Sequence, residues 1–270
     1  MAYLNNQTVL ISGGASGIGA LMGAEFLAAG ASRLVIWDVN LELAQEVREK
    51  LQQGSVEVIA QCVDVTSLSA MQAAYQELLD SRIEIDVLVN NAGIIVGKKF
   101  WDHSHEEIER TLRVNTRALM DLTLIVLPAM RSRGRGHIVN ISSAAAMVAN
   151  PNMSVYCASK WAVLGWSDSL RLELESEQSG VKVTSVTPYY IHTGMFAGVR
   201  SRFIPILRPE YVARKIVAAT IKGRIFLRMP RILYLVPLLR GVLGVRAFDL
   251  IAGKLLGIYK SMDDFRGRVP

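Results

Sequence analysis

The residues with the clearest chemical potential in this sequence are a tyrosine and a lysine four positions apart, Tyr156 and Lys160. In a helix that spacing places both side chains on one face. A phenol has an ordinary pKa of about 10, too high for an efficient proton acceptor at neutral pH, but a neighbouring ammonium favours the phenolate. The pair can therefore act as a general base toward an alcohol and, in reverse, as a general acid.

Two serines precede this pair. Ser143 lies 13 residues before Tyr156, directly after an apolar stretch, 137–141, that is typical of a buried strand. A hydroxyl there can hydrogen-bond the oxygen of a substrate and stabilise the charge that develops on it. The adjacent Ser142 is the alternative donor.

A glycine-rich turn, residues 12–19, follows the apolar run 8–11 and leads into a segment of helical period. Glycines in such a turn let backbone amides approach a pyrophosphate that a Cβ would keep away. The helix N-terminus adds N–H groups and a favourable dipole. The context therefore favours a dinucleotide site over a plain loop.

Asp38 ends the next apolar run, 19 residues after Gly19, where a carboxylate can bind the ribose hydroxyls of a dinucleotide. It would repel a 2′-phosphate, and the residues that follow, Val39 and Asn40, supply no base. NAD is therefore expected rather than NADP. The alternative role for Asp38 is to cap the helix that begins at Leu41.

Short apolar runs alternate with segments of helical period through the first two thirds of the chain. Runs that are apolar on both faces and alternate with helices predict a parallel sheet covered on both sides. The expected fold class is α/β, a Rossmann-type doubly wound parallel sheet. Strands are expected at 8–11, 34–37, 56–61, 87–89, 137–141, 181–186 and 225–227, and helices at 17–29, 41–53, 67–79, 105–130, 154–177 and 209–222.

Taken in order, several short motifs resemble the short-chain dehydrogenase/reductase family over residues 7–228. They are Ser12-Gly13 with Gly17-Ile18-Gly19, Asp64-Val65, Asn90-Asn91-Ala92-Gly93, Asn115, Ile141-Ser142-Ser143 and Tyr156-Cys157-Ala158-Ser159-Lys160. The resemblance implies catalysis by Asn115, Ser143, Tyr156 and Lys160. It favours Ser143 over Ser142 by spacing, and it implies that Asn115 holds a water linked to the lysine. The cofactor-binding residues that it implies are Ser12, Gly13, Ser16, Gly17, Ile18, Gly19, Asp38, Asp64, Val65, Asn91, Ala92, Gly93, Tyr156, Lys160, Pro188 and Thr193.

Within that set, the resemblance implies that Asp64 and Val65 contact the adenine ring and that Thr193 contacts the nicotinamide carboxamide. Lys160 would also hydrogen-bond the nicotinamide ribose. The sequence departs from the family after Pro188, where a tyrosine stands in place of the usual glycine. The conformation of this loop is therefore expected to differ from the family pattern.

Charge is distributed unevenly along the chain. Residues 1–199 hold 15 Lys and Arg against 20 Asp and Glu, whereas residues 200–270 hold 15 against 4, a balance of +11. The basic residues of the tail are interleaved with Ile, Leu, Phe and Tyr, and no nucleic-acid-binding motif accompanies them. We expect two parts, an NAD-binding catalytic domain, 1–228, and a basic amphipathic extension, 229–270.

The longest uncharged stretch of this extension, 232–239, has eight residues, and a spanning helix needs about 20. The extension is therefore expected to lie on a membrane surface, to cover the active site as a lid, or to contact another subunit. Two stretches, 193–196 and 228–234, resemble one branch of the family. That branch contains retinol dehydrogenases and 17β-hydroxysteroid dehydrogenases, which act on lipophilic alcohols.

Composition and residue counts exclude other classes. With 51% hydrophobic and 20% charged residues, the chain is not disordered. Two cysteines, Cys62 and Cys157, and four histidines show no ligand spacing, so we expect no metal site and a reducing compartment. The first residues lack a signal-peptide pattern. The expected location is cytoplasmic, with peripheral contact to a membrane.

These observations together predict an NAD-dependent oxidoreductase that interconverts a lipophilic alcohol, retinol-like, steroid or long-chain, and its carbonyl by hydride transfer, with Tyr156 as base or acid. The alternatives are a carbonyl or 3-oxoacyl reductase and a non-catalytic nicotinamide-sensing protein. Proteins of the last kind usually lack the tyrosine or the lysine. The family resemblance also implies a homodimer or homotetramer, formed through the helices at 105–130 and 154–177.

Overall fold

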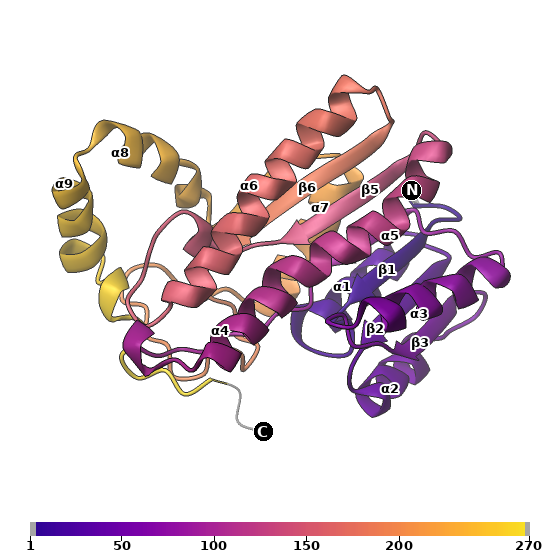
Figure 1. The fold of residues 1–270 in the computed structure, drawn as a ribbon, viewed down its shortest axis with the longest axis horizontal. Helices are drawn as coiled ribbons and strands as arrows, with labels where there is room; N and C mark the ends of the chain where they lie inside the picture. The colour runs from indigo at the N-terminus through magenta and orange to yellow at the C-terminus, as the bar shows by residue number, and fades with distance from the viewer. Residues whose placement is uncertain (1–3, 268–270) are drawn as a thin grey trace.

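A seven-stranded parallel sheet runs through the computed structural model, which describes residues 4–267 (Figure 1). The strand order is β3-β2-β1-β4-β5-β6-β7, which confirms the doubly wound Rossmann-type arrangement. The strands are β1 (Thr8–Ser12), β2 (Arg33–Asp38), β3 (Glu57–Cys62), β4 (Val87–Asn90), β5 (Gly136–Ile141), β6 (Val181–Pro188) and β7 (Phe226–Met229).

Two layers of helices cover the sheet because its strands are apolar on both faces. Along β1, Val9 and Ile11 belong to one buried core and Leu10 belongs to the other, as the alternation of strand side chains requires. The first face is covered by α1 (Gly17–Ala28), α2 (Leu41–Leu51) and α7 (Pro209–Ile221). The second is covered by α3 (Leu68–Asp80), α5 (Ala118–Ser132) and the later turns of α6 (Ser154–Ser176).

The helix expected at 105–130 is present but is interrupted once. After α4 (His105–Leu112) the chain makes a π turn over Arg113–Arg117, and α5 follows directly. The N–H of Ala118 donates to the carbonyl of Arg113, five residues earlier. A π turn holds one residue more than a regular turn, and such turns are frequent at functional sites.

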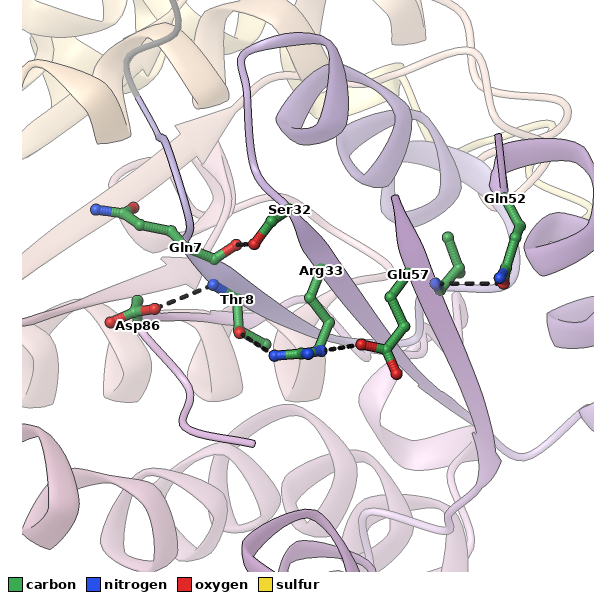
Figure 2. Close-up of polar contacts among 8 residues, drawn as sticks. Gln7, Thr8, Ser32, Arg33, Gln52, Glu57 and Asp86 are labelled. Atoms are coloured by element: carbon green, nitrogen blue, oxygen red, sulfur yellow. Dashed lines mark hydrogen bonds and ion pairs between the residues drawn. The ribbon is translucent and has the colours of Figure 1, made fainter. Parts of the chain in front are cut away.

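Polar side chains pair the first three strands at their amino ends (Figure 2). The carboxylate of Asp86 accepts a hydrogen bond from the N–H of Thr8 at 3.0 Å. The guanidinium of Arg33 donates both to the hydroxyl of Thr8, at 3.4 Å, and to the carboxylate of Glu57. These contacts lie at the amino ends of the strands. In such folds ligands bind at the opposite edge of the sheet, at the carboxyl ends of the strands, where the strand order reverses between β1 and β4.

Beyond β7 the chain forms short helices that project from one end of the sheet (yellow in Figure 1). They are a 3₁₀ turn at Arg231–Tyr234, α8 (Val236–Val242), α9 (Val245–Asp249) and a π turn at Leu250–Leu255. The extension is thus several short pieces and not one amphipathic helix. In the part of the chain that the structure describes, we find no helix with the length and apolar character needed to cross a bilayer.

Candidate active site

A cleft of about 660 Å³ lies at the carboxyl ends of the central strands. Most of the expected site residues line it, namely Gly13, Ser16, Gly17, Ile18, Asp38, Asp64, Val65, Asn91, Ala92, Gly93, Ser143, Tyr156, Lys160, Pro188 and Thr193. Three expected residues, Ser12, Gly19 and Asn115, do not line the cleft and instead support its walls. The cleft also has walls that the sequence analysis did not identify, among them Trp37, Ile94, Arg110 and Val114.

Ser12 and Asn91 join the turns that follow β1 and β4. The hydroxyl of Ser12 accepts hydrogen bonds from the N–H groups of Asn91 and Ala92 at 3.1 and 3.2 Å. The side-chain amide of Asn91 donates to the carbonyls of Ser12 and Gly13 at 3.0 and 2.8 Å. These contacts fix the glycine turn against the sheet, so its backbone is shaped before any ligand arrives.

The glycines of this turn are required by close backbone approach. Gly13 and Gly17 have φ of +64° and +57°, in the left-handed region that favours glycine. A Cβ on Gly19 would lie 2.1 Å from the carbonyl oxygen of Gly13. A cradle of this shape at the start of α1 suits a pyrophosphate.

Asp38 lies at the end of β2, on the wall of the cleft. Its carboxylate accepts hydrogen bonds from the N–H groups of Ala15 and Asn40 at 3.0 and 3.1 Å. The helix α2 is capped by Asn40, whose side chain accepts from the N–H of Leu43, so the capping alternative for Asp38 does not apply. Its position suits contact with a ribose.

Tyr156 and Lys160 lie together on α6 and are both buried. The ammonium of Lys160 is 5.8 Å from the centre of the Tyr156 ring and donates to the carbonyl of Ile141 at 3.0 Å. Burial lowers the pKa of Lys160 to about 8. Burial also raises the pKa of Tyr156, and the nearby hydroxyl of Ser143 only partly opposes that. In the protein alone, desolvation therefore outweighs the expected stabilisation of the phenolate by the lysine.

The structure distinguishes the two serines after β5. The hydroxyl of Ser142 donates to the carbonyl of Lys160 at 2.9 Å and is buried, so it anchors α6. Both serines line the cleft, but the hydroxyl of Ser143 accepts from the N–H of Ala145 at 3.1 Å and is not committed as a donor to the backbone of α6, and it also hydrogen-bonds the side chain of Tyr156. Ser143 is therefore the serine placed to meet a ligand.

Asn115 is the central residue of the π turn and is fully buried. Its side-chain oxygen accepts from the N–H of Ile94 at 2.8 Å, and its amide nitrogen donates to the Ile94 carbonyl at 2.9 Å and to the hydroxyl of Ser159 at 3.1 Å. A Cβ added to Gly93 would meet both Asn115 and the ammonium of Lys160, at 3.3 and 3.6 Å. Asn115 thus holds the loop after β4 beside the lysine.

A second, apolar cavity of about 100 Å³ adjoins the cleft. The two cavities share Ser143, Tyr189 and Phe196 in their walls. The far wall comes from the C-terminal extension, through residues that include Leu233, Val236, Leu239, Phe248, Ile251 and Leu256. The sequence analysis left a lid over the active site as one alternative for the extension, and its contacts with this cavity are those that a lid would make. It did not indicate which residues of the extension would line the cavity.

The donor groups of the cleft suit a dinucleotide and an alcohol. The glycine cradle, the carboxylate of Asp38 and the buried pair of Tyr156 and Lys160 lie along one continuous cavity. Across residues 4–267, no three His, Cys, Asp or Glu side chains gather in a way that could hold a metal ion. The side chains of Ser143, Tyr156 and Lys160 in this cleft can form hydrogen bonds and transfer a proton.

Comparisons with known proteins agree with this geometry. A family model described as short chain dehydrogenase matches residues 7–202. Epidermal retinol dehydrogenase 2 of Mus musculus is 36% identical over 267 residues, which cover 97% of this chain and 86% of the relative.

Two solved structures share the fold. A short chain dehydrogenase/reductase from Burkholderia phymatum, in complex with NAD, has a TM-score of 0.80 at 23% identity, over 88% of this chain and 94% of that one. A metagenomic short-chain oxidoreductase, in complex with NADP, has a TM-score of 0.72 at 27% identity, over 84% and 98% of the two chains.

Replacing Gly19 by alanine should weaken NAD⁺ binding by at least about tenfold, a loss of about 1.4 kcal/mol, because the new Cβ would force the backbone of the turn to move. Isothermal titration calorimetry measures the change. The matched control is Gly165→Ala, since Gly165 lies on α6 with no atom within 4 Å of an added Cβ. The control should bind as the wild type does, and an equally tight Gly19→Ala variant would contradict the assignment of the cradle.

Proposed function

The chain belongs to the short chain dehydrogenase family, and from that premise we propose that it oxidises a lipophilic alcohol to the carbonyl with NAD⁺. The observation that carries the proposal is the apolar cavity that opens from the cleft at Ser143, Tyr189 and Phe196. Such a cavity selects a substrate with little polar surface. Retinol-like alcohols are the first candidate substrates, because a relative is named a retinol dehydrogenase. Steroids and long-chain alcohols are the other candidates.

In the proposed reaction the carbon that bears the hydroxyl loses a hydride and the hydroxyl loses a proton. Bound NAD⁺ would supply the hydride acceptor and a positive charge beside the phenol. Tyr156, as the phenolate, accepts the proton. Ser143 donates a hydrogen bond to the substrate oxygen and orients it. The ammonium of Lys160 stabilises the phenolate and, with a pKa of about 8, remains largely protonated at neutral pH.

The same groups support the reverse reaction, which is the second candidate. Burial raises the pKa of Tyr156, so the protonated phenol is favoured in the protein alone. A protonated phenol is the form that donates a proton to a carbonyl oxygen during reduction. This supports a carbonyl or 3-oxoacyl reductase as the alternative direction of the same chemistry.

We propose that NAD is preferred over NADP because of Asp38. The carboxylate ends β2 and lies on the cleft wall, and the next residue, Val39, carries no charge. A 2′-phosphate would meet a negative group with no cation from this turn to balance it. The ribose hydroxyls of NAD would instead donate hydrogen bonds to Asp38.

We propose that the C-terminal extension docks on an anionic membrane surface. Side chains on one side of the extension line the apolar cavity. On the other side, Leu238, Val242 and Val245 are between 63% and 76% exposed. Large apolar side chains that are exposed together in this way are typical of a surface that contacts a protein or a membrane. Residues 229–270 hold 7 Lys and Arg against 3 Asp and Glu, a balance of +4, which complements an anionic surface.

The arginines in and next to the extension differ in how accessible their side chains are to a membrane surface. Arg240 stacks over the rings of Trp161 and Phe248 and donates to the carbonyl of Met147. Arg228 stacks over the rings of Phe226 and Tyr234. The side chain of Arg246, by contrast, is 98% exposed, and its guanidinium lies 3.9 Å from the carboxylate of Asp249. The exposed leucine and valines, with Arg246, are therefore the sharper probes of docking.

We also propose a homodimer formed through α5 and α6. Leu124 on α5 and Leu172 on α6 are both more than half exposed. Both are large apolar side chains on the helices that the family resemblance implicates. A twofold contact would bury them in both protomers.

Replacing Tyr156 by phenylalanine should lower the turnover of all-trans-retinol with NAD⁺ at least about 10²-fold, the usual size of a general acid–base contribution. The ring is retained, so the dissociation constant of NAD⁺ should stay nearly unchanged. The matched control is Tyr211→Phe on α7, where the phenol is exposed and activity should not change. Wild-type turnover in the Tyr156→Phe variant would exclude Tyr156 as the base.

Steady-state kinetics with both cofactors test the role of Asp38. The wild type should prefer NAD⁺, and Asp38→Ala should reduce that preference by about tenfold, or about 1.4 kcal/mol. Asp38→Asn separates the effect of the negative charge from the effect of the hydrogen bond, because it removes the charge and keeps an acceptor for the N–H of Ala15. A wild-type preference for NADP⁺ would overturn the assignment.

Liposome co-sedimentation tests the docking of the extension. Binding should rise with anionic lipid and weaken with salt, since each basic residue near such a surface contributes about 1 kcal/mol. The triple variant Leu238→Gln, Val242→Gln and Val245→Gln should stay in the supernatant, and Arg246→Gln should weaken binding. The control is Leu68→Gln on α3, an exposed leucine away from the extension. If the triple variant sediments like the wild type, or if neither sediments, docking is refuted.

Light scattering tests the assembly. The wild type should have at least twice the chain mass of 29.7 kDa. Leu124→Glu with Leu172→Glu should release monomers, because a charge in an apolar contact is costly. A measured wild-type mass of 29.7 kDa, the mass of one chain, would contradict the proposed homodimer.

A further inference from the structure

Three buried polar side chains from distant parts of the chain meet behind the apolar cavity. They are Asn150, just before α6, Tyr190, just after β6, and Ser261, in the C-terminal extension. The amide nitrogen of Asn150 lies 2.9 Å from the phenol oxygen of Tyr190 and 2.9 Å from the hydroxyl oxygen of Ser261. The two hydroxyl oxygens are themselves 2.9 Å apart. The hydroxyl of Tyr190 also lies 3.5 Å from the sulfur of Met153, and the side-chain oxygen of Asn150 has no hydrogen-bond partner among the described residues. Loss of the Ser261 hydroxyl would leave the amide nitrogen of Asn150 and the phenol of Tyr190 each with one buried partner fewer.

This junction connects to the catalytic tyrosine through aromatic rings. The ring of Tyr190 packs edge to face against Phe196, with centroids 5.1 Å apart. The ring of Phe196 packs in the same way against Tyr156, at 6.0 Å. Edge-to-face contacts fix the relative orientation of such rings. The position of the Tyr190 phenol therefore determines where Phe196 lies over Tyr156.

The backbone of the extension holds the same loop. The N–H of Arg200 donates to the carbonyl of Ser261 at 3.1 Å, and the N–H of Arg266 donates to the carbonyl of Ala197 at 2.9 Å. Gly198 has a φ of +87°, and a Cβ there would lie 2.0 Å from the carbonyl oxygen of Asp264. Residues 261–267 thus lie directly against the loop that carries Phe196.

We propose that Ser261 is a positioning residue for Tyr156, because its hydroxyl fixes Tyr190 and thereby keeps Phe196 packed over the catalytic phenol. The extension would then contribute to the chemical step as well as to the wall of the cavity. The kinetic part of this inference rests on the proposed alcohol oxidation. The structural part, that Ser261 holds the loop, does not.

The test replaces Ser261 by alanine and measures retinol oxidation with NAD⁺ across pH. When Phe196 is no longer held, water reaches Tyr156 and reduces the desolvation that raises its pKa. The acidic limb of the pH profile of kcat/KM should move to lower pH by at least about half a unit. The kcat on the high-pH plateau should fall about tenfold because the phenol is less well oriented, while the KM for NAD⁺ stays unchanged.

A matched control and a second variant separate positioning from general destabilisation. Thr220→Val removes a hydroxyl that is also buried but that donates within α7, to the carbonyl of Ile216 at 3.0 Å. That variant should keep the wild-type pH profile and kcat. Tyr190→Phe removes the phenol oxygen but keeps the ring, and it should reproduce the effects of Ser261→Ala even if Ser261→Ala folds poorly.

Amide hydrogen exchange gives a readout that needs no turnover. Ser261→Ala should raise the exchange of residues 189–197 by about tenfold or more, and Thr220→Val should leave it as in the wild type. Unchanged exchange overturns the proposal, and so does a pH profile identical to that of the control. If the wild type oxidises no alcohol, the proposed function fails, and the exchange data still decide whether Ser261 holds the loop.

Discussion

The arrangement of the site depends on keeping one ammonium group inside the protein. Lys160 is only 4% exposed, and a buried charge is costly unless hydrogen bonds compensate it. Its ammonium donates to the carbonyl of Ile141, which is available because β5 ends there. The bond from Ser142 to the Lys160 carbonyl keeps α6 over that strand end, and Gly93 adds no side chain on the facing loop. Helix, strand end and loop are therefore fixed around this one cation.

Once Lys160 is fixed, the positions of the other groups follow. Tyr156 lies one helical turn earlier on α6, and Ser143 lies just past the end of β5. Ser143 lines both the polar cleft and the apolar cavity, and Tyr156 lines the cleft and packs against Phe196, which lines both. The chemistry is thus placed at a boundary between two environments, one suited to a dinucleotide and the other to a hydrocarbon.

The sequence predicted what local patterns encode. The strands and helices of the body appear within one or two residues of their expected bounds, because periodicity and turn residues are local signals. The family resemblance was confirmed for the same reason, since each motif is short. The π turn was missed because a single helical period was assigned to 105–130, and the residues of Arg113–Arg117 carry no local signal for the extra residue.

Long-range contacts were beyond the sequence. Tyr190 and Ser261 lie 71 residues apart, and no spacing links them before the chain folds. Arg228 and Arg240 were counted as charges, whereas the structure uses both to stack against aromatic rings. The raised pKa of Tyr156 likewise depends on burial, which only tertiary packing determines.

The π turn at Arg113–Arg117 has a consequence for helix phase. A regular helix advances about 100° per residue, so one additional residue rotates everything after it by about that angle. In this chain α4 ends on the cleft side, with Arg110 in the wall, while α5 presents Leu122 and Val126 to the core. The extra residue allows one continuous helix to serve two differently oriented surfaces. A regular helix over the same residues would turn Leu122 and Val126 away from the core by about 100° if α4 kept its place at the cleft.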